Sequence, residues 1–359
     1  MRLPKLWSGG VIGVLRSFGA LFPLLIGRGL NSHGVIQEFT EDEPFEVGFA
    51  VHYEKHLKPY VDEFESRRIV ALRKARSRLF TILPVMAVAL TFGYYALFLN
   101  GWDEEAKNAI FPGTVIALVA IVWWVNRSLN AYQASIKSDI FPEIVEFLGD
   151  YQFTADIDAR INRFKDFGIV PSHDSESSED RIVGEYKGVH IDLFETRLTE
   201  TRGSEEDRQT VTVFKGVVIS LSMNKRFEGK TIVLKDQGRL VNWVKDKFSN
   251  LETVKLEDPR FEKEFEIYSN DQVEARYLLT PSFMNRLSDL RAAFGGKGIE
   301  CSFFQNNLLM MISIERNMFE PGSIFEREDF IDDAKSLLKE MTTIFQVVDT
   351  LQLDLDVGL

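Results

Sequence analysis

Hydrophobic residues follow three different patterns along this chain, and the patterns divide it into parts. Two long runs carry no charge: residues 79–100 (LFTILPVMAVALTFGYYALFLN) and 110–125 (IFPGTVIALVAIVWWV). On either side of these runs, hydrophobic residues recur every three or four positions, which predicts helices with one apolar face. From residue 182 onward, short apolar segments alternate with turn residues, which is typical of strands.

The two uncharged runs predict a pair of transmembrane helices, residues 79–100 and 110–126, joined by an external loop at 101–109. A helix needs about 20 apolar residues to cross the hydrocarbon core of a bilayer. A buried hairpin of a soluble protein is the alternative. Six basic residues precede the first run, whereas the loop holds three acids and one base, so the positive-inside rule places both chain termini in the cytoplasm. This membrane-surface basic cluster, which also attracts anionic lipid, consists of Arg67, Arg68, Arg73, Lys74, Arg76 and Arg78.

The segments around these runs predict a helical stalk. Residues 41–78 form a pre-membrane amphipathic helix, with Phe49, Tyr53 and Leu57 on one face and a bend at Pro59. Residues 127–170 form post-membrane helices, and residues 171–181 (PSHDSESSEDR) form a linker. Residues 1–40 are basic, and three interpretations stay open: an interfacial helix, a disordered leader, or a start codon further upstream.

Residues 182–359 predict a cytoplasmic α+β domain. Strands are expected on both sides of the turn at 186–188, at 210–223, at 229–236 and at 251–257, and a hairpin at 298–315 turns at Asn306 and Asn307. We expect helices at 240–248 and over 259–294, a mobile loop at 198–210, and a closing amphipathic helix at 328–352. The fold class is therefore α+β: a transmembrane hairpin with its stalk, then a largely antiparallel sheet, with a pleckstrin-like barrel as the alternative.

Composition limits the classes of partner that this chain is expected to bind. The net charge is −12 and the pI is about 5.1, so no basic surface suited to nucleic acid is expected. The single cysteine, Cys301, excludes an intrachain disulfide and lies in an apolar stretch, which favours a buried structural thiol.

At FEKEFEIYSNDQVEARYLLTPSFMNRL, residues 261–287, and VFKGVVIS, residues 213–220, the chain resembles the bacterial two-span membrane proteins catalogued as domain of unknown function (DUF) 3137. The resemblance runs from about Phe45 to Val348. It implies the two-span topology and a bacterial inner-membrane location. This family has no established activity, so the resemblance brings no catalytic residues.

Candidate chemistry is sparse. His52 and His56 have the helical spacing of two metal ligands, but HYEKH lacks the metalloprotease pattern and identifies no third ligand, so they are weak candidates. Asp271 and Glu274 fit a capping box. Arg276 either pairs with a neighbouring acid or holds a ligand phosphate. GGKG at 295–298 is interpreted as the end of a helix, and FKG at 214–216 as a bulge within a strand. We predict no cofactor and no catalytic residue.

These observations lead to three functional hypotheses. The first is a membrane-anchored cytoplasmic adaptor or scaffold that binds other membrane or cytoplasmic proteins, with homo-oligomers as a further option. The second is a domain that binds lipid or a small ligand at the membrane surface. The third is an enzyme whose site is assembled from residues distant in the sequence.

Overall fold

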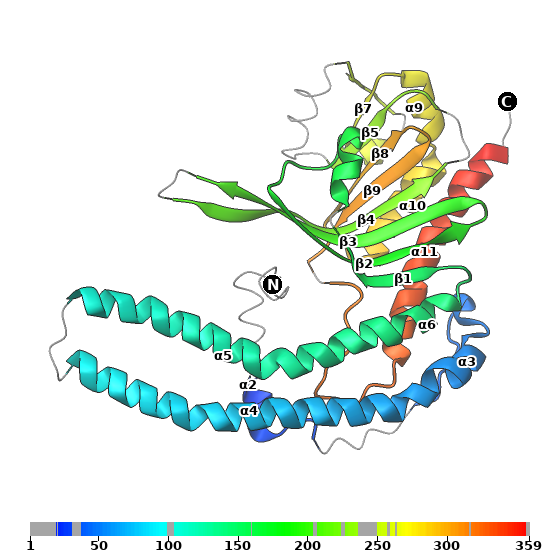
Figure 1. The fold of residues 1–359 in the computed structure, drawn as a ribbon. Coiled ribbons are helices and arrows are strands. Elements are labelled where there is room, and N and C mark those ends of the chain that lie inside the picture. The colour runs from blue at the N-terminus through cyan, green and yellow to red at the C-terminus, as the bar shows by residue number, and fades with distance from the viewer. Residues whose placement is uncertain are drawn as a thin grey trace. The chain divides into compact units, whose positions relative to one another are not determined.

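The computed structural model divides the chain into two compact units. The first comprises residues 1–40, 50–140 and 321–332, and the second comprises residues 41–49, 141–320 and 333–359. Figure 1 labels their elements. The residues that the structure describes are 19, 21–30, 37–98, 104–158, 160–203, 207–223, 227–235, 250–256, 259–262, 264–315 and 317–356.

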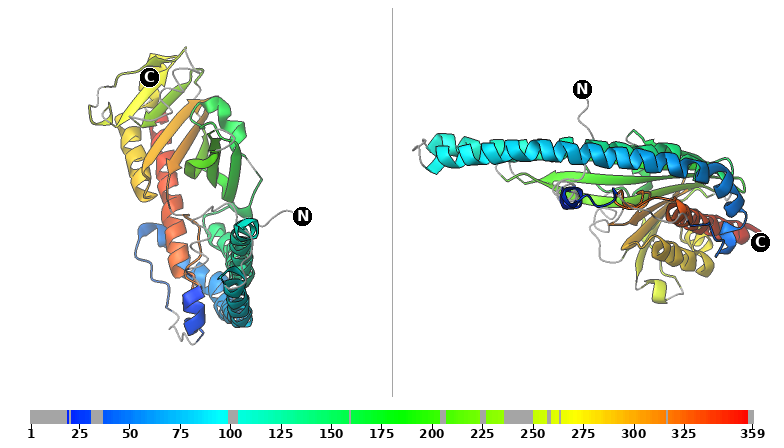
Figure 2. Two further views of the ribbon diagram at one scale, coloured as in Figure 1. Left: turned by 90° about the vertical axis from the view of Figure 1, so that its left-hand side faces the viewer. Right: turned by 90° about the horizontal axis from the view of Figure 1, so that it is seen from below.

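Two long helices form most of the first unit. Helix α4 (Lys58–Phe98) and helix α5 (Glu104–Asp139) run side by side as an antiparallel hairpin (Figures 1 and 2). They are preceded by α2 (Leu21–Ile26), α3 (Phe49–His52) and the π-helical turn η3 (Tyr53–Leu57). The π-helical turn lies directly before Lys58 and Pro59 of α4, within one continuous helical stretch.

The prediction of two transmembrane helices is wrong. Among the residues that the structure describes, no helix is long and apolar enough to cross a membrane, which also argues against a two-span inner-membrane protein. The predicted apolar runs are parts of longer helices. Helix α4 has 41 residues and begins with a charged, partly buried segment, and helix α5 has 36 residues and ends with a polar, partly buried segment. Residues 99–103, in the predicted external loop, lie outside the described part of the chain.

Buried contacts hold segment 321–332 to the base of the hairpin. Phe64 of α4 packs edge-on against Phe330, with ring centroids 5.5 Å apart. The Tyr53 hydroxyl donates to the Asp329 carbonyl at 2.9 Å. Both aromatic side chains of the helical segment are fully buried. The apolar spacing of residues 49–64 therefore does mark a core face, but its partner is a distant segment that the helical pattern does not reveal.

The second unit is built on one nine-stranded sheet with the order β1-β2-β3-β4-β9-β8-β5-β7-β6, and all pairings are antiparallel. This confirms the large antiparallel sheet and replaces the barrel alternative, because β1 and β6 are edges. The strands are β1 (Gln152–Asp156), β2 (Ser175–Tyr186), β3 (Val189–Arg202), β4 (Gln209–Ser222), β5 (Thr231–Lys235), β6 (Glu252–Thr253), β7 (Phe265–Ser269), β8 (Gly298–Phe304) and β9 (Asn307–Ser313).

Helices cover both faces of this sheet. On one face, α10 (Pro281–Ala293) packs Phe283 against Phe303, and α11 (Ile331–Asp356) packs Phe345 against Tyr186. On the other face, the short helix η4 (Ile161–Phe167) packs Phe164 against Phe194. The other helices in the described part of this unit are η2 (Pro44–Glu46), α6 (Phe141–Glu146), α8 (Pro259–Glu262) and α9 (Gln272–Leu278).

Several elements differ from the sequence-based expectation. The predicted linker contains the first half of β2, where Ser177 and Ser178 pair with β3; its polar residues conceal a strand. The predicted helical stretch 259–294 is interrupted by β7, whose FEIYS is buried against β5. The hairpin of β8 and β9 turns at Gln305 and Asn306, both with positive φ, one residue earlier than predicted. The predicted helix at 240–248 lies outside the described residues.

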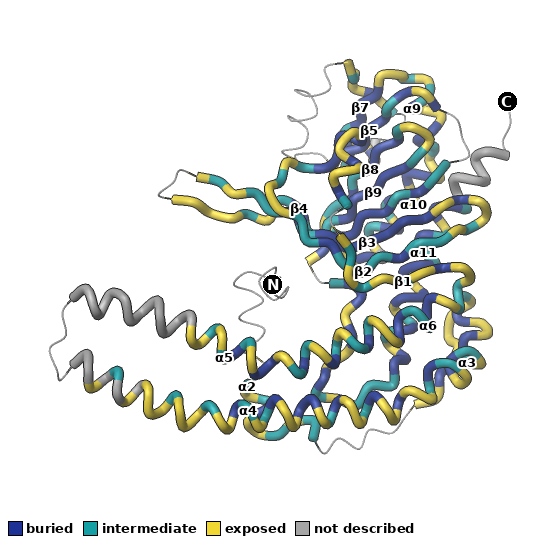
Figure 3. Tube along the Cα trace, in the orientation of Figure 1, coloured by how far each residue is buried: buried dark blue, intermediate teal, exposed yellow. Residues whose placement is uncertain are grey.

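The predicted mobile loop at 198–210 is largely a paired hairpin. Strand β3 continues to Arg202, and β4 begins at Gln209, with Arg202 opposite Gln209 in the register. We call residues 199–202 and 209–214 the β-arm. Figure 3 shows that the end of this hairpin is exposed. Threonine and valine are the most frequent residues of the β-arm, and both favour strands, which explains why β3 and β4 extend into it. The polar, charged residues at its tip led to the prediction of a loop.

Candidate functional site

Helix α4 exposes an apolar segment between Phe80 and Tyr95. The exposed fraction is 50% for Phe80, 59% for Val85 and 71% for Val88. Leu83 and Val85 are both exposed although they point about 200° apart on a helix. Most helices of soluble proteins bury one apolar stripe. Exposed apolar side chains on more than one side of α4 therefore present a surface that favours an apolar partner.

Arginines and aromatic rings lie together where this segment begins. The guanidinium carbons of Arg76 and Arg78 lie 5.4 Å and 5.3 Å from the ring centroids of Phe80 and Trp124. Arg78 also donates to the Trp124 carbonyl at 2.9 Å. Such pairs of tryptophan and arginine suit a boundary between apolar and aqueous surroundings, because each side chain has an apolar body and a polar end.

The six residues of the predicted basic cluster have different surroundings in the structure. Arg73 and Lys74 are exposed, and Arg76 and Arg78 contact the aromatic rings. Arg67 is bound to Glu63 and Asp139, and these bonds raise its pKa. Arg68 is fully buried and donates to Glu65 and to two backbone carbonyls, so it is a core residue of the first unit.

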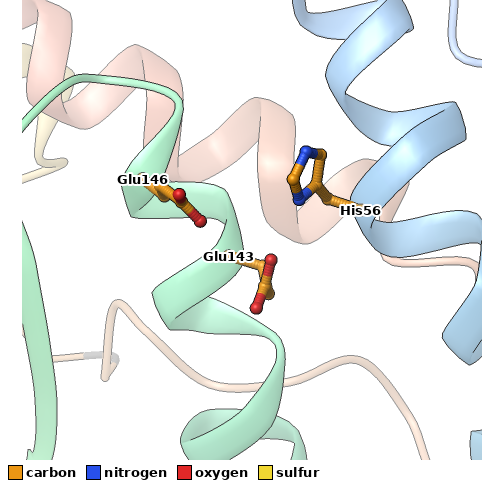
Figure 4. Close-up of side chains that lie close together, drawn as sticks. All are labelled: His56, Glu143 and Glu146. Carbon is orange, nitrogen blue, oxygen red and sulfur yellow. The ribbon is translucent and has the colours of Figure 1, made fainter.

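The two histidines do not form a chelating pair. The rings of His52 and His56 are stacked, 4.5 Å apart and 10° from parallel. The nitrogen lone pairs lie in the ring planes, so stacked rings cannot direct them at one ion. Figure 4 draws His56 together with Glu143 and Glu146 of α6, but the histidine and the two glutamates belong to different units, and no metal site is assigned to them.

The residues that resemble the DUF3137 motif have structural roles. Asp271 is the N-cap of α9 and accepts from the backbone N–H of Val273 and Glu274. Glu274 does not complete the capping box; its carboxylate accepts from the backbone N–H of Glu228 and Gly229 instead. Arg276 is exposed and donates to Gln272 of the same helix, so neither a neighbouring acid nor a phosphate is needed to explain it.

The second unit contains a cluster of three largely buried acidic residues that no sequence pattern predicts. Carboxylate oxygens of Glu179, Asp180 and Glu195 lie within 4.8 Å of one another. Oxygen ligands of this kind are those that Ca²⁺ and Mg²⁺ prefer. Glu195, however, already accepts from the backbone N–H of Met318 and Phe319, which is a structural explanation for part of the group. Residues 317–320, which include Met318 and Phe319, line a pocket of about 210 Å³ together with residues of α11.

Glu300 is a carboxyl group of the sheet with a strongly raised pKa. It lies on β8, opposite Met311 of β9. Burial raises its pKa from 4.5 to about 7, and the charge of Lys235 lowers it by less. Its neighbour Cys301 is fully buried, and burial raises the pKa of the thiol as well, which confirms the structural interpretation of this cysteine.

We expect Glu300 to make the stability of the second unit depend on pH. Because its pKa is higher in the folded than in the unfolded chain, its contribution is complete below about pH 4.5 and is lost as the pH rises through about 7. The loss should be ~3 kcal/mol in the free energy of unfolding. Urea unfolding at both ends of this range measures it. Glu300→Gln should be less sensitive to pH, and an unchanged dependence in this variant would contradict the assignment.

The second unit is thus an α+β protein built on one large antiparallel sheet. Over residues 212–353 the chain matches the model of a family described as "Protein of unknown function (DUF3137)", which confirms the resemblance for that part of the chain. No curated protein matches. The crystal structure of the mycobacterial trehalose monomycolate transport factor A, TtfA, is similar with a TM-score of 0.33 and 12% identity, over 58% of this chain and 90% of that chain. A similarity this low carries no argument.

Proposed function

We propose that this chain is a scaffold protein that attaches to a lipid surface through the apolar segment of α4 and presents its sheet unit to partner proteins. The observation that supports this proposal is the exposure of Phe80, Val85, Val88 and Tyr95 on a segment without charge. Burying each such side chain in an apolar phase contributes about 1.5–3 kcal/mol. The proposal concerns contact with lipid and does not require a helix to cross a membrane.

The surrounding charges favour an anionic lipid surface. Arg73 and Lys74 are exposed next to the apolar segment, although the chain as a whole carries a charge of −12. Each basic residue near an anionic surface contributes ~1 kcal/mol. The full chain is therefore expected to bind vesicles that contain phosphatidylglycerol more tightly than vesicles of phosphatidylcholine alone.

Val88→Glu is expected to weaken vesicle binding of the full chain by about 30-fold. Placing a carboxylate in the apolar part of a lipid layer costs ~2 kcal/mol or more, since the charge loses its hydration. Co-flotation with phosphatidylglycerol vesicles measures the binding. Val273→Glu is the matched control, because Val273 is 78% exposed on α9 of the other unit.

Two outcomes would oppose the proposal. Absence of the wild-type chain from the floating vesicles would exclude lipid contact by this segment. Equal losses in Val88→Glu and Val273→Glu would show that added negative charge, rather than the apolar segment, controls binding. Arg73→Gln should lower the preference for anionic vesicles by a smaller amount, because one basic residue contributes only ~1 kcal/mol.

A further inference from the structure

Helix α2 buries one side and exposes an apolar face on the other. Leu24 is 2% exposed, whereas the exposed fraction is 69% for Phe22 and 62% for Ile26, and Leu25 is exposed as well. On an α-helix, Phe22, Leu25 and Ile26 point within about 100° of one another. Leu24 points roughly to the opposite side. The segment LFPLLI contains no polar side chain, so the exposed face of α2 is wholly apolar.

Contacts within the first unit hold α2 against α4 (Figures 1 and 2). The turn after α2 contains Gly27, where a Cβ atom would lie 2.7 Å from a guanidinium nitrogen of Arg76. Two residues further on, the Gly29 carbonyl accepts from the buried Arg68 at 2.9 Å. Because Arg68 is a core residue of this unit, the exposed face of α2 is held in a defined position on it.

This face adjoins the beginning of the apolar segment of α4. Arg76, which contacts the turn after α2, also lies with its guanidinium carbon 5.4 Å from the ring centroid of Phe80. Phe80 and Leu83 follow Arg76 by four and seven residues, so the three side chains point to one side of α4, within about 60° of one another. Leu83 is about 10 Å beyond Arg76 along the helix axis. We call the exposed side chains that adjoin here the α2–α4 patch: Phe22, Leu25, Ile26, Phe80 and Leu83.

The charges around the α2–α4 patch favour an anionic lipid surface as its occupant. Residues 1–37 contain four basic residues and no acid, although the whole chain carries a charge of −12. Arg73 and Lys74 are exposed on α4 shortly before the patch begins. A face that carries only hydrocarbon side chains needs no hydrogen-bonding partner, and helices at a membrane surface bury such a face ~5–10 Å deep in the headgroup region.

We propose that α2 is a second lipid-contact element, which enters the same lipid surface as α4 through Phe22, Leu25 and Ile26. This inference rests on the proposed lipid attachment of α4, and it identifies the side of α4 that faces the lipid as the one that carries Phe80 and Leu83. Contact through α4 alone would leave rotation about its axis open. A second contact from α2 fixes the orientation of the first unit on the lipid surface.

Ile26→Glu is expected to weaken vesicle binding of the full chain about tenfold, because a carboxylate would replace an apolar side chain in the lipid layer. Ile26→Leu is the matched control, since it keeps an apolar side chain of the same size and should bind as the natural chain does. Co-flotation with phosphatidylglycerol vesicles measures both variants. Equal binding of the two would contradict lipid contact by α2.

Fluorophores on introduced cysteines test the contact directly in the full chain. Cys301 is fully buried, so the environment-sensitive dye NBD labels the introduced thiol. With vesicles of equal parts phosphatidylglycerol and phosphatidylcholine, Ile26→Cys and Val88→Cys should both show blue-shifted emission that nitroxide-labelled lipids quench. Val273→Cys, on α9 of the other unit, is the control and should show neither change.

The pattern of responses separates this inference from the proposed function. A response at position 88 without one at position 26 would overturn the role of α2 and leave the lipid attachment of α4 in place. No response at either position would overturn both, and a response at position 26 alone would overturn the shared surface. Blue-shifted emission at position 26 that needs no vesicles and increases with protein concentration would show that a second copy covers α2, which also overturns the proposal.

Discussion

Replacing Arg68 with alanine is expected to lower the free energy of unfolding of the first unit by ~3–5 kcal/mol. Arg68 is fully buried in α4 and binds Glu65 through two nitrogens, at 2.7 Å and 2.8 Å. It also donates to the carbonyls of Ile324 at 2.8 Å and Gly29 at 2.9 Å. Alanine would leave a largely buried carboxylate and two carbonyls without this donor.

Urea unfolding of the full chain, followed by a probe in the first unit, measures this effect. Arg67→Ala is the matched control, because the side chain of Arg67 is 42% exposed and its bonds to Glu63 and Asp139 are surface ion pairs worth about 0–1 kcal/mol. Arg68→Lys should restore only part of the stability, since lysine cannot form the two parallel bonds to Glu65. Equal effects of the two alanine variants would contradict the assigned role.

Gly216→Ala is expected to destabilise the sheet by ~3 kcal/mol. A Cβ atom at Gly216 would lie 1.9 Å from the Ile312 carbonyl oxygen and 2.9 Å from its carbon. Both are backbone atoms, so the clash requires β4 and β9 to separate. This pair of strands joins the β1–β4 part of the sheet to the β9–β6 part, which makes the separation costly.

The control for this variant is Gly298→Ala in β8. There the added Cβ would meet only the flexible end of Lys235, at 3.3 Å. Thermal unfolding of both variants measures the difference, and we expect Gly298→Ala to remain within about 1 kcal/mol of the natural chain. A similar loss in both variants would show that the close approach at Gly216 is not what requires glycine.

Gly216 also corrects the interpretation of FKG as a bulge. The irregularity in the β3–β4 pairing lies opposite Leu198 and Thr199, between Thr212 and Phe214 of β4. It is therefore adjacent to the motif, but the glycine itself serves the close contact with β9. A sequence reveals that a strand contains glycine; it does not reveal which neighbouring strand approaches it.

The sequence determined the elements whose pattern is local. The turn at 186–188, the N-cap Thr280 with Pro281, the end of α10 near Gly295 and the burial of Cys301 all follow from short-range rules for turns, caps and apolar stretches. The antiparallel sheet follows from alternation and short connections. The turns, caps and hairpins depend on contacts between residues that are near in the chain, whereas the pairings of β4 with β9 and of β5 with β8 join distant segments.

Only the tertiary structure decided the features that depend on distant partners. Arg68 reads as one of six membrane-surface charges, yet its partners include carbonyls 39 and 256 residues away, and these make it a core residue. The uncharged run of α4 reads as a membrane span, but no described helix meets the length and apolarity that crossing requires. The β-arm reads as a loop because its tip is polar, but among the described residues it extends beyond the sheet as two strands, because β9 pairs with β4 only from Gly216 to Ser222. In each case the sequence supplies the chemical groups, and long-range packing decides which of them are buried, paired or exposed.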